Sequence, residues 1–177
     1  MADYSKARTR ILRKKLTQAY LWSILNYNPL TGSFVWKSRS DISANVNARF
    51  IGKPAGWQRK DSYLFIGIQG TVFLASHLAY RMMTGKFPKN EIDHEDTDPS
   101  NNRWKNFRPA TRSQNMSNTR ARNGFKGVSL TTNKQRWRAR IGYQKKHFYI
   151  GTYDTEQAAH AAYCEVATRL HKKFARF

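Results

Sequence analysis

The sequence predicts an α+β protein made of short strands and a few amphipathic helices. Apolar residues recur every three or four positions over 9–26, which is the period of one helix face. Apolar and polar residues alternate through 33–37 and through 136–141, which is typical of half-buried strands. A chain of 177 residues is long enough for one medium domain or two small ones.

The region before residue 90 is expected to mix helices with hairpins. Asn28-Pro29 begins a turn signal, Gln69-Gly70 is a hairpin signal, and Ser76 is a candidate helix cap. The expected elements are a helix over 9–26, a turn at 28–32, a strand at 33–37, a surface loop over 38–48, strands at 63–68 and 72–74, and a helix over 76–83 that Gly85 ends.

The region after residue 118 is expected to be a second small unit. Residues 119–124 are polar and basic and end in glycine, as a linker would. Thr155 is a credible N-cap, and Glu156 in the first turn favours the helix dipole. The expected elements are strands at 126–130, 136–141 and 147–151 and a helix over 155–170.

The chain is strongly basic, with 32 Lys and Arg against 11 Asp and Glu and a formal net charge of +21. Such a field favours a polyanion, because each phosphate that is neutralised releases condensed counterions. A membrane surface would also attract this charge, but no apolar run approaches the ~18–20 residues that span a bilayer. We therefore expect no membrane partner.

The N-terminal residues indicate where the protein acts, and the cysteine count limits the metal sites that it can form. Residues 1–6 have no apolar core of signal-peptide type, so we expect an intracellular protein. Cys164 is the only cysteine, which excludes an intramolecular disulfide and a zinc site made of cysteines.

The most informative motif is Asp93-His94, which is followed by Asn106 and Asn115. Phosphodiester hydrolysis needs a base that activates water and a metal that neutralises charge. Histidine suits the first task, and carboxylate and amide oxygens suit Mg²⁺. Adjacent residues on an extended strand point in opposite directions, so Asp93 and His94 can take separate roles. These residues indicate a metal-dependent nuclease.

The same residues resemble the HNH endonucleases, nearest to the phage and intron-encoded homing type. The likeness extends from about Leu16 to Asn118 and makes this chain an H-N-N variant. The motif positions that carry it are Ile92-Asp93-His94, Asn101-Asn102-Arg103, Asn106-Phe107-Arg108, Thr111, Gln114 and Asn115.

The resemblance implies a ββα-metal fold, in which a hairpin and a helix hold one divalent ion. By this analogy Asp93 and Asn115 are the metal ligands, His94 is the general base, and Asn106 fixes the loop and the His94 backbone. The expected ion is Mg²⁺, with Mn²⁺ as the alternative, and the expected products carry 5′-phosphate and 3′-hydroxyl ends. The arginines expected to contact phosphates are Arg103, Arg108 and Arg112.

The C-terminal region predicts a reader of double-stranded DNA. Alternation places Arg136, Arg138 and Arg140 on one face of a strand, and the 155–170 helix offers alanines to cover the other face. Arginine pairs bidentately with guanine, which makes these three the candidates for base contacts. The residues expected to share that surface are Lys126, His147 and Tyr149.

The C-terminal region also resembles the APETALA/ethylene-response-factor DNA-binding domain, over about Asn123 to Phe174. The resemblance implies a three-stranded antiparallel sheet packed on one helix, with the sheet in the major groove. The segments that carry it are Phe125-Lys126-Gly127-Val128, Trp137-Arg138-Ala139-Arg140-Ile141, and Ile150-Gly151-Thr152-Tyr153 with the alanine-rich helix.

Together these patterns predict a two-domain DNA endonuclease that acts on DNA in the cytoplasm of a host cell. The expected division is 1–118 for the nuclease core, 119–124 for a linker and 125–177 for the DNA-binding domain. The alternative is a DNA-binding regulator or architectural protein with a degenerate nuclease core; an RNA-binding protein is disfavoured, because no aromatic single-strand platform stands out. No obligatory protein partner is evident. The recognition sequence, the oligomeric state and the choice between nicking and double-strand cleavage stay open.

Overall fold

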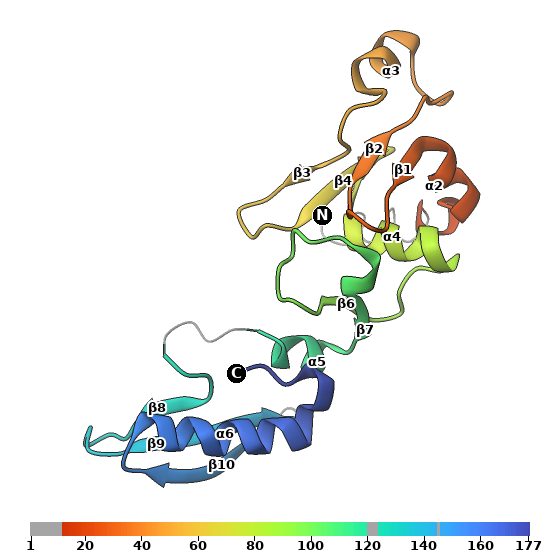
Figure 1. Ribbon diagram of the computed structural model, residues 1–177. Coiled ribbons are helices and arrows are strands. Elements are labelled where there is room, and N and C mark those ends of the chain that lie inside the picture. The colour runs from red at the N-terminus through yellow and green to blue at the C-terminus, as the bar shows by residue number, and fades with distance from the viewer. Residues whose placement is uncertain (1–11, 120–123, 145) are drawn as a thin grey trace, which may run out of the picture. The chain divides into compact units, whose positions relative to one another are not determined.

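The computed structural model of the chain describes residues 12–119, 124–144 and 146–177. It forms two compact units, Met1–Pro109 and Ala110–Phe177 (Figure 1). Most of the expected linker, residues 120–123, lies outside the described residues. Nothing helical in the described ranges has the length and apolar content needed to cross a bilayer.

The first unit is built from hairpins and helices around one core. The β1–β2 and β3–β4–β5 sheets are antiparallel, and β6 and β7 form a third, two-stranded sheet. The core lies where α2 packs on α4, and Leu21, Ile66, Leu78 and Met82 are almost fully buried there. The elements are a helical turn at 12–15, α2 Gln18–Ile24, β1 Leu25–Tyr27, β2 Phe34–Trp36, α3 Ala44–Phe50, β3 Trp57–Gln58, β4 Leu64–Ile68, β5 Thr71–Leu74, α4 Ala75–Thr84, β6 Glu91–His94, η1 Trp104–Asn106 and β7 Phe107–Ala110.

The helix expected over 9–26 is wrong in its continuity and in its end. The Thr17 hydroxyl accepts a hydrogen bond from the Tyr20 amide at 3.1 Å and starts a new helix, α2, as an N-cap does. The chain becomes extended at Leu25, where β1 pairs with β2 and buries Leu25 and Tyr27 on one side. Apolar spacing alone did not distinguish this strand from another helical turn.

Two further expectations for the first unit need correction. The surface loop expected over 38–48 contains most of α3, which begins after Ser43. Ser76 is buried inside α4, and the N-cap position belongs to Leu74. The expected end of that helix is confirmed, because Gly85 has a φ of 73° and its amide donates to the Arg81 carbonyl at 2.9 Å.

The second unit is a three-stranded antiparallel sheet, in the order β10–β9–β8, with one long helix, α6, across it (Figure 1). Alternation along β9 buries Ala139 and Ile141 toward α6, where Tyr163 and Ala167 complete the core. The strands and the helix expected here are confirmed, and Thr155 is the N-cap, accepting from the Ala158 amide at 3.1 Å. The elements are α5 Arg112–Ser117, β8 Val128–Leu130, β9 Trp137–Tyr143, β10 Lys146–Tyr153, α6 Glu156–His171 and η2 Lys172–Phe174.

Gly127 shows why the chain before β8 can approach α6 so closely. A Cβ at this position would lie 2.3 Å from the Tyr163 ring and 2.5 Å from the Arg140 carbonyl oxygen, and the φ of Gly127 is +72°. Both the space and the backbone conformation therefore require glycine.

Candidate functional site

Asp93 and His94 are neighbours on β6, and both are buried, with 3% and 5% of their surfaces exposed. The Asp93 carboxylate accepts a hydrogen bond from Arg108 Nε of β7 at 2.7 Å, and Arg108 Nη1 lies 3.5 Å from Glu95 Oε1. A buried charge without a partner is costly, so Arg108 compensates the negative charge of Asp93. The β6–β7 sheet thus holds a buried carboxylate beside a buried imidazole.

The imidazole of His94 lies in an aromatic surrounding. Tyr63 and Phe107 contact the His94 ring edge-on, with centroid distances of 5.9 and 5.3 Å. Burial lowers the pKa of His94, and a hydrogen bond with Asn102 and the nearby Asp96 carboxylate oppose that shift. His94 is therefore neutral near pH 7, which is the form that accepts a proton.

Asn106 holds the loop that follows His94. Its side-chain oxygen accepts from the Asp96 amide at 3.1 Å, and its Nδ2 donates to Asp96 Oδ1 and to the Asn101 carbonyl, both at 2.9 Å. Its own carbonyl accepts from the Glu95 amide at 2.9 Å. These four bonds close the loop onto the residue next to His94.

The β1–β2 hairpin supports the same loop from the other side. The Tyr27 hydroxyl donates to the Asn102 carbonyl at 2.8 Å, and the Trp104 amide donates to the Pro29 carbonyl at 2.9 Å. A Cβ on Gly32 would lie 2.5 Å from the Asn102 carbonyl carbon, so only glycine permits this approach. The hairpin positions Asn102, which in turn orients His94.

The second unit presents a polar, cationic sheet face. Cross-strand partners share a face in an antiparallel sheet, and Arg138 pairs with Ser129 on one side and Thr152 on the other. Arg140 pairs with Tyr149, which is 61% exposed. Arg138 Nε is buried without a hydrogen-bond partner among the described residues. This face has the composition of a surface that meets a hydrogen-bonding polyanion.

Helix α5 carries Asn115 and Arg112 and belongs to the second unit. A capping box, formed by Thr111 and Gln114, begins the helix. Lys126 caps the C-terminal end of α5: its ammonium donates to the carbonyls of Ser117 and, at 2.8 Å, of Thr119. Cations at a helix C-terminus are stabilising, so α5 is fixed at both ends.

Comparison with known families gives two matches along the chain. Residues 73–117 match a model described as HNH endonuclease, and residues 123–172 match a model described as AP2 domain. The chain carries an HNH endonuclease domain followed by an AP2 domain. No curated protein matches the chain. The HNH match supports a nuclease, and the AP2 match supports DNA binding.

Within the HNH match, the donor set is compatible with a hard divalent ion. HNH nucleases use a divalent metal, and Asp93, within the matched segment, offers a carboxylate oxygen of the kind that hard divalent ions accept. Across the described residues there is no cluster of three or more His, Cys, Asp and Glu side chains.

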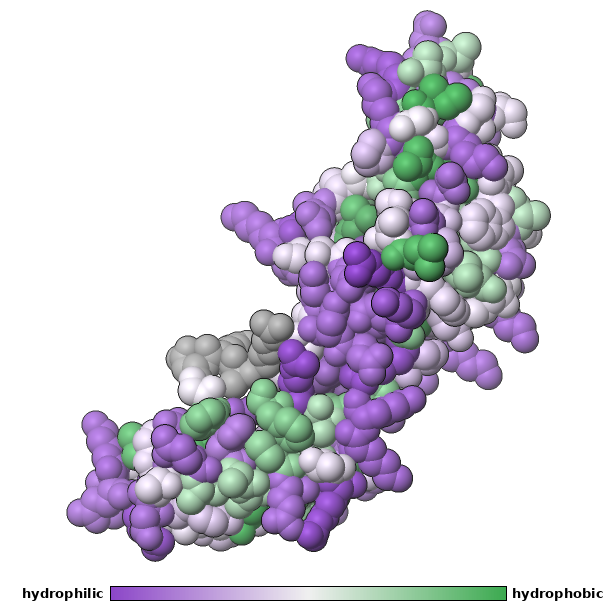
Figure 2. Space-filling model, in the orientation of Figure 1, coloured by the Kyte–Doolittle hydropathy of each residue, from purple (hydrophilic) through white to green (hydrophobic). Residues whose placement is uncertain are grey.

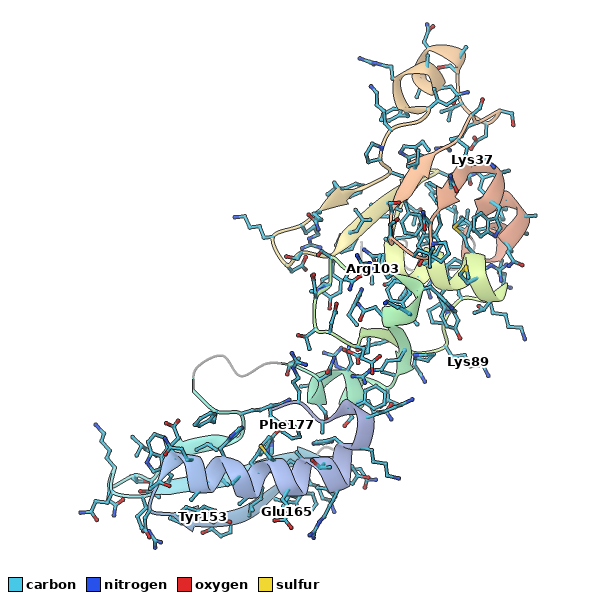
Figure 3. The ribbon with its side chains drawn as sticks, viewed as in Figure 1. Lys37, Lys89, Arg103, Tyr153, Glu165 and Phe177 are labelled. Atoms are coloured by element: carbon cyan, nitrogen blue, oxygen red, sulfur yellow. The ribbon has the colours of Figure 1, made fainter. Side chains whose placement is uncertain are left out.

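The expected site residues fall into groups. Asp93, His94 and Asn106 lie together around β6 and the loop that follows it, and Arg103 is exposed on that loop (Figure 3). Arg138, Arg140, Tyr149 and His147 lie on the AP2 sheet. Arg136 is exposed next to that sheet, where its Nε is 2.9 Å from Asp154 Oδ1.

Two expected DNA contacts are engaged inside the protein instead. Arg108 is only 8% exposed and pairs with Asp93. Lys126 is half-buried under α5, and burial lowers the pKa of Lys126 to about 8. Asn102, which the sequence predicts only as loop structure, is a further candidate site residue; its hydrogen bond with His94 depends on a fold contact that spacing does not encode.

We expect acid to destabilise the first unit through His77. Burial, with the Arg13 guanidinium 3.4 Å away, lowers the pKa of His77 to about 4 from 6.5. Because the folded pKa is below the unfolded value, this stability is present above about pH 6.5 and is lost as the pH falls toward about 4, by about 3 kcal/mol. Urea unfolding at pH 7 and pH 4.5 measures it. His77→Gln should reduce the difference, and an equal loss in both proteins would contradict the assignment.

Proposed function

We propose that the protein is a divalent-metal-dependent DNA endonuclease of the phage homing type, which yields 5′-phosphate and 3′-hydroxyl ends. The observation that carries the proposal is the buried Asp93–His94 pair on β6, inside the segment that matches the HNH model. The AP2 domain supplies binding to double-stranded DNA. The proposed setting is the DNA of a host cell.

In this proposal His94 is the general base. Its lowered pKa keeps the imidazole neutral near pH 7, and the Asn102 hydrogen bond holds its orientation. A neutral imidazole accepts a proton from the attacking water, and a positioned base of this kind contributes about 10²–10⁴-fold to a rate. Asn106 acts through position, since its side chain is engaged with the loop beside His94.

Asp93 and Asn115 are the proposed ligands of the ion, with Mg²⁺ as the first choice and Mn²⁺ as the alternative. A divalent ion bound there would neutralise phosphate charge and stabilise the leaving 3′ oxygen. Arg103 and Arg112 are exposed and remain proposed phosphate contacts. The proposed functional division is 1–118 for the nuclease, 119–124 for the linker and 125–177 for the reader, although α5 is compact with the second unit.

The second candidate is a DNA-binding regulator with an inactive nuclease core. The Arg108–Asp93 ion pair is the observation that favours it, because Arg108 uses the Oδ2 oxygen of a proposed ligand. In that case the carboxylate serves the fold, and the AP2 sheet is the functional surface. The two candidates differ in the role of the Asp93 carboxylate: it is a metal ligand in the nuclease and only the ion-pair partner of Arg108 in the regulator.

Replacing Asp93 separates them. Asp93→Asn keeps the size of the side chain but removes a charged oxygen ligand, so plasmid cleavage should fall at least about a hundredfold. Calorimetric titration with Mn²⁺ should show weaker binding. The control is Asp61→Asn, which removes an exposed carboxylate of the first unit outside the HNH match, and it should still cleave. Cleavage by Asp93→Asn at the parent rate would overturn the ligand assignment, and a parent that binds DNA without cutting it in any metal would favour the regulator.

A further inference from the structure

Helix α3 is unusual in this fold because it buries none of its residues. Val46, Phe50 and Ile51 are 39%, 49% and 48% exposed, although each is strongly apolar. Val46, Arg49 and Phe50 stand at i, i+3 and i+4 and therefore share one face. Figure 2 shows hydrophobic surface among hydrophilic surface over this helix. We call Val46, Arg49, Phe50, Ile51 and Lys53 the α3 surface.

The segment that bears this surface is firmly attached to the rest of the first unit. After α3 the chain returns alongside β2: the Gly52 amide donates to the Trp36 carbonyl at 2.9 Å, and the Ala55 amide donates to the Phe34 carbonyl at 2.8 Å. Before α3, the Lys37 ammonium donates to the Trp22 carbonyl at 2.9 Å. Lys37 is labelled in Figure 3. Both ends of the segment that carries α3 are thus held by hydrogen bonds to β2 and α2.

The inner side of α3 is held by polar contacts instead of apolar packing. Asn47 Nδ2 donates to Ser38 Oγ and to the Arg39 carbonyl, both at 3.1 Å, and Asn47 Oδ1 accepts from the Arg39 amide at 3.0 Å. Arg39 lies over the Trp36 ring at 5.1 Å and pairs with Asp41 at 2.8 Å. The apolar residues of α3 therefore contribute little to the fold, and they remain available to a partner.

The charge of residues 37–61, the segment around α3, identifies the kind of partner. Residues 37–61 contain six Lys and Arg against two Asp. Arg49 and Lys53 are exposed and form no ion pair with a described residue. Apolar side chains flanked by unpaired cations are typical of elements that press into the minor groove, where the cations meet the flanking phosphates. An acidic protein surface would engage only the cations, and an apolar protein surface would engage only the apolar side chains.

We propose that the α3 surface is a DNA-contacting element separate from the nuclease centre and from the AP2 sheet. Phe50 and Ile51 lie against the minor groove, and Arg49 and Lys53 bind the phosphates on either side. This contact adds affinity for the duplex, and it does not depend on cleavage.

Binding of the full chain to a 60-base-pair duplex, measured by fluorescence anisotropy in EDTA at several salt concentrations, tests the proposal. Phe50→Ala with Ile51→Ala should weaken binding about fivefold to tenfold without changing the salt slope. Arg49→Gln with Lys53→Gln should weaken binding and lower the slope by about two, since each phosphate contact contributes about 0.9. Because EDTA prevents cutting, failure of the nuclease proposal would not affect this result.

Val72→Ser is the matched control, because Val72 is a 52% exposed apolar residue on β5, outside the α3 surface. It should bind DNA like the parent. Parent-like affinity in both double variants would overturn the proposal. Light scattering measures the oligomeric state of the same proteins. If the parent is a dimer and the Phe50→Ala, Ile51→Ala protein is a monomer, this surface is a self-association face, and the DNA-contact proposal is overturned.

Discussion

Replacing His94 by Ala should lower the rate of DNA cleavage by about 10²–10⁴-fold while leaving DNA affinity nearly unchanged. The physical reason is that His94 is the buried imidazole of the HNH segment, kept neutral near pH 7 by a lowered pKa. The variant removes the proposed proton acceptor but none of the exposed cations that are proposed to contact phosphates. Cleavage of labelled DNA and anisotropy binding, run on the same preparation, measure the two effects separately.

The control for this experiment is the partly buried His77 of the first unit. His77→Gln removes an imidazole whose pKa is also lowered by burial, but His77 lies on α4 beside Arg13. This variant should cleave at the parent rate at pH 7. If His77→Gln lost as much activity as His94→Ala, the effect would be one of stability and the role of His94 as a base would be refuted.

The second large effect is expected on the AP2 sheet. Arg138→Ala with Arg140→Ala should weaken binding to duplex DNA by about tenfold to a hundredfold at moderate salt, and should reduce the salt slope by about two. Both arginines lie on the face opposite α6, beside Ser129, Thr152 and Tyr149. Binding isotherms from low to moderate salt give both quantities.

Arg169 provides the matched control for the double variant. It lies on α6, is 75% exposed, and pairs with Glu165 one turn earlier. Arg169→Ala removes one exposed cation from the same domain without altering the sheet, so its effect on affinity should be small. A salt slope that stays at the parent value in the Arg138→Ala, Arg140→Ala protein would make the sheet face a solvated surface.

The parts of the fold that local pattern determines were predictable from the sequence. Strict alternation along 136–141 placed Ala139 and Ile141 toward the helix, and turn chemistry placed the end of α4 at Gly85. Thr155 could be identified as a cap from its position before an alanine-rich helix. These signals lie within a few residues of what they control.

The parts that depend on distant contacts were not predictable. Leu25 and Tyr27 continue an apolar spacing that fits a helix, and only pairing with β2 makes them a strand. The apolar residues of helix α3 stay exposed, so they do not mark a side that faces the core. In the site, the Arg108–Asp93 pair and the Tyr27–Asn102 bond join residues 15 and 75 positions apart, so composition suggested phosphate contact for Arg108 where the fold uses it to balance a buried carboxylate.

Conversion of supercoiled plasmid tests the central claim most directly. The purified parent and His94→Ala are each incubated with Mg²⁺, with Mn²⁺ and with EDTA, and the nicked and linear forms are quantified. We predict metal-dependent conversion by the parent, none in EDTA, and loss of conversion in His94→Ala with DNA binding retained. Conversion by His94→Ala at the parent rate, or binding by the parent without cutting in any metal on DNA of varied sequence, would contradict the nuclease account.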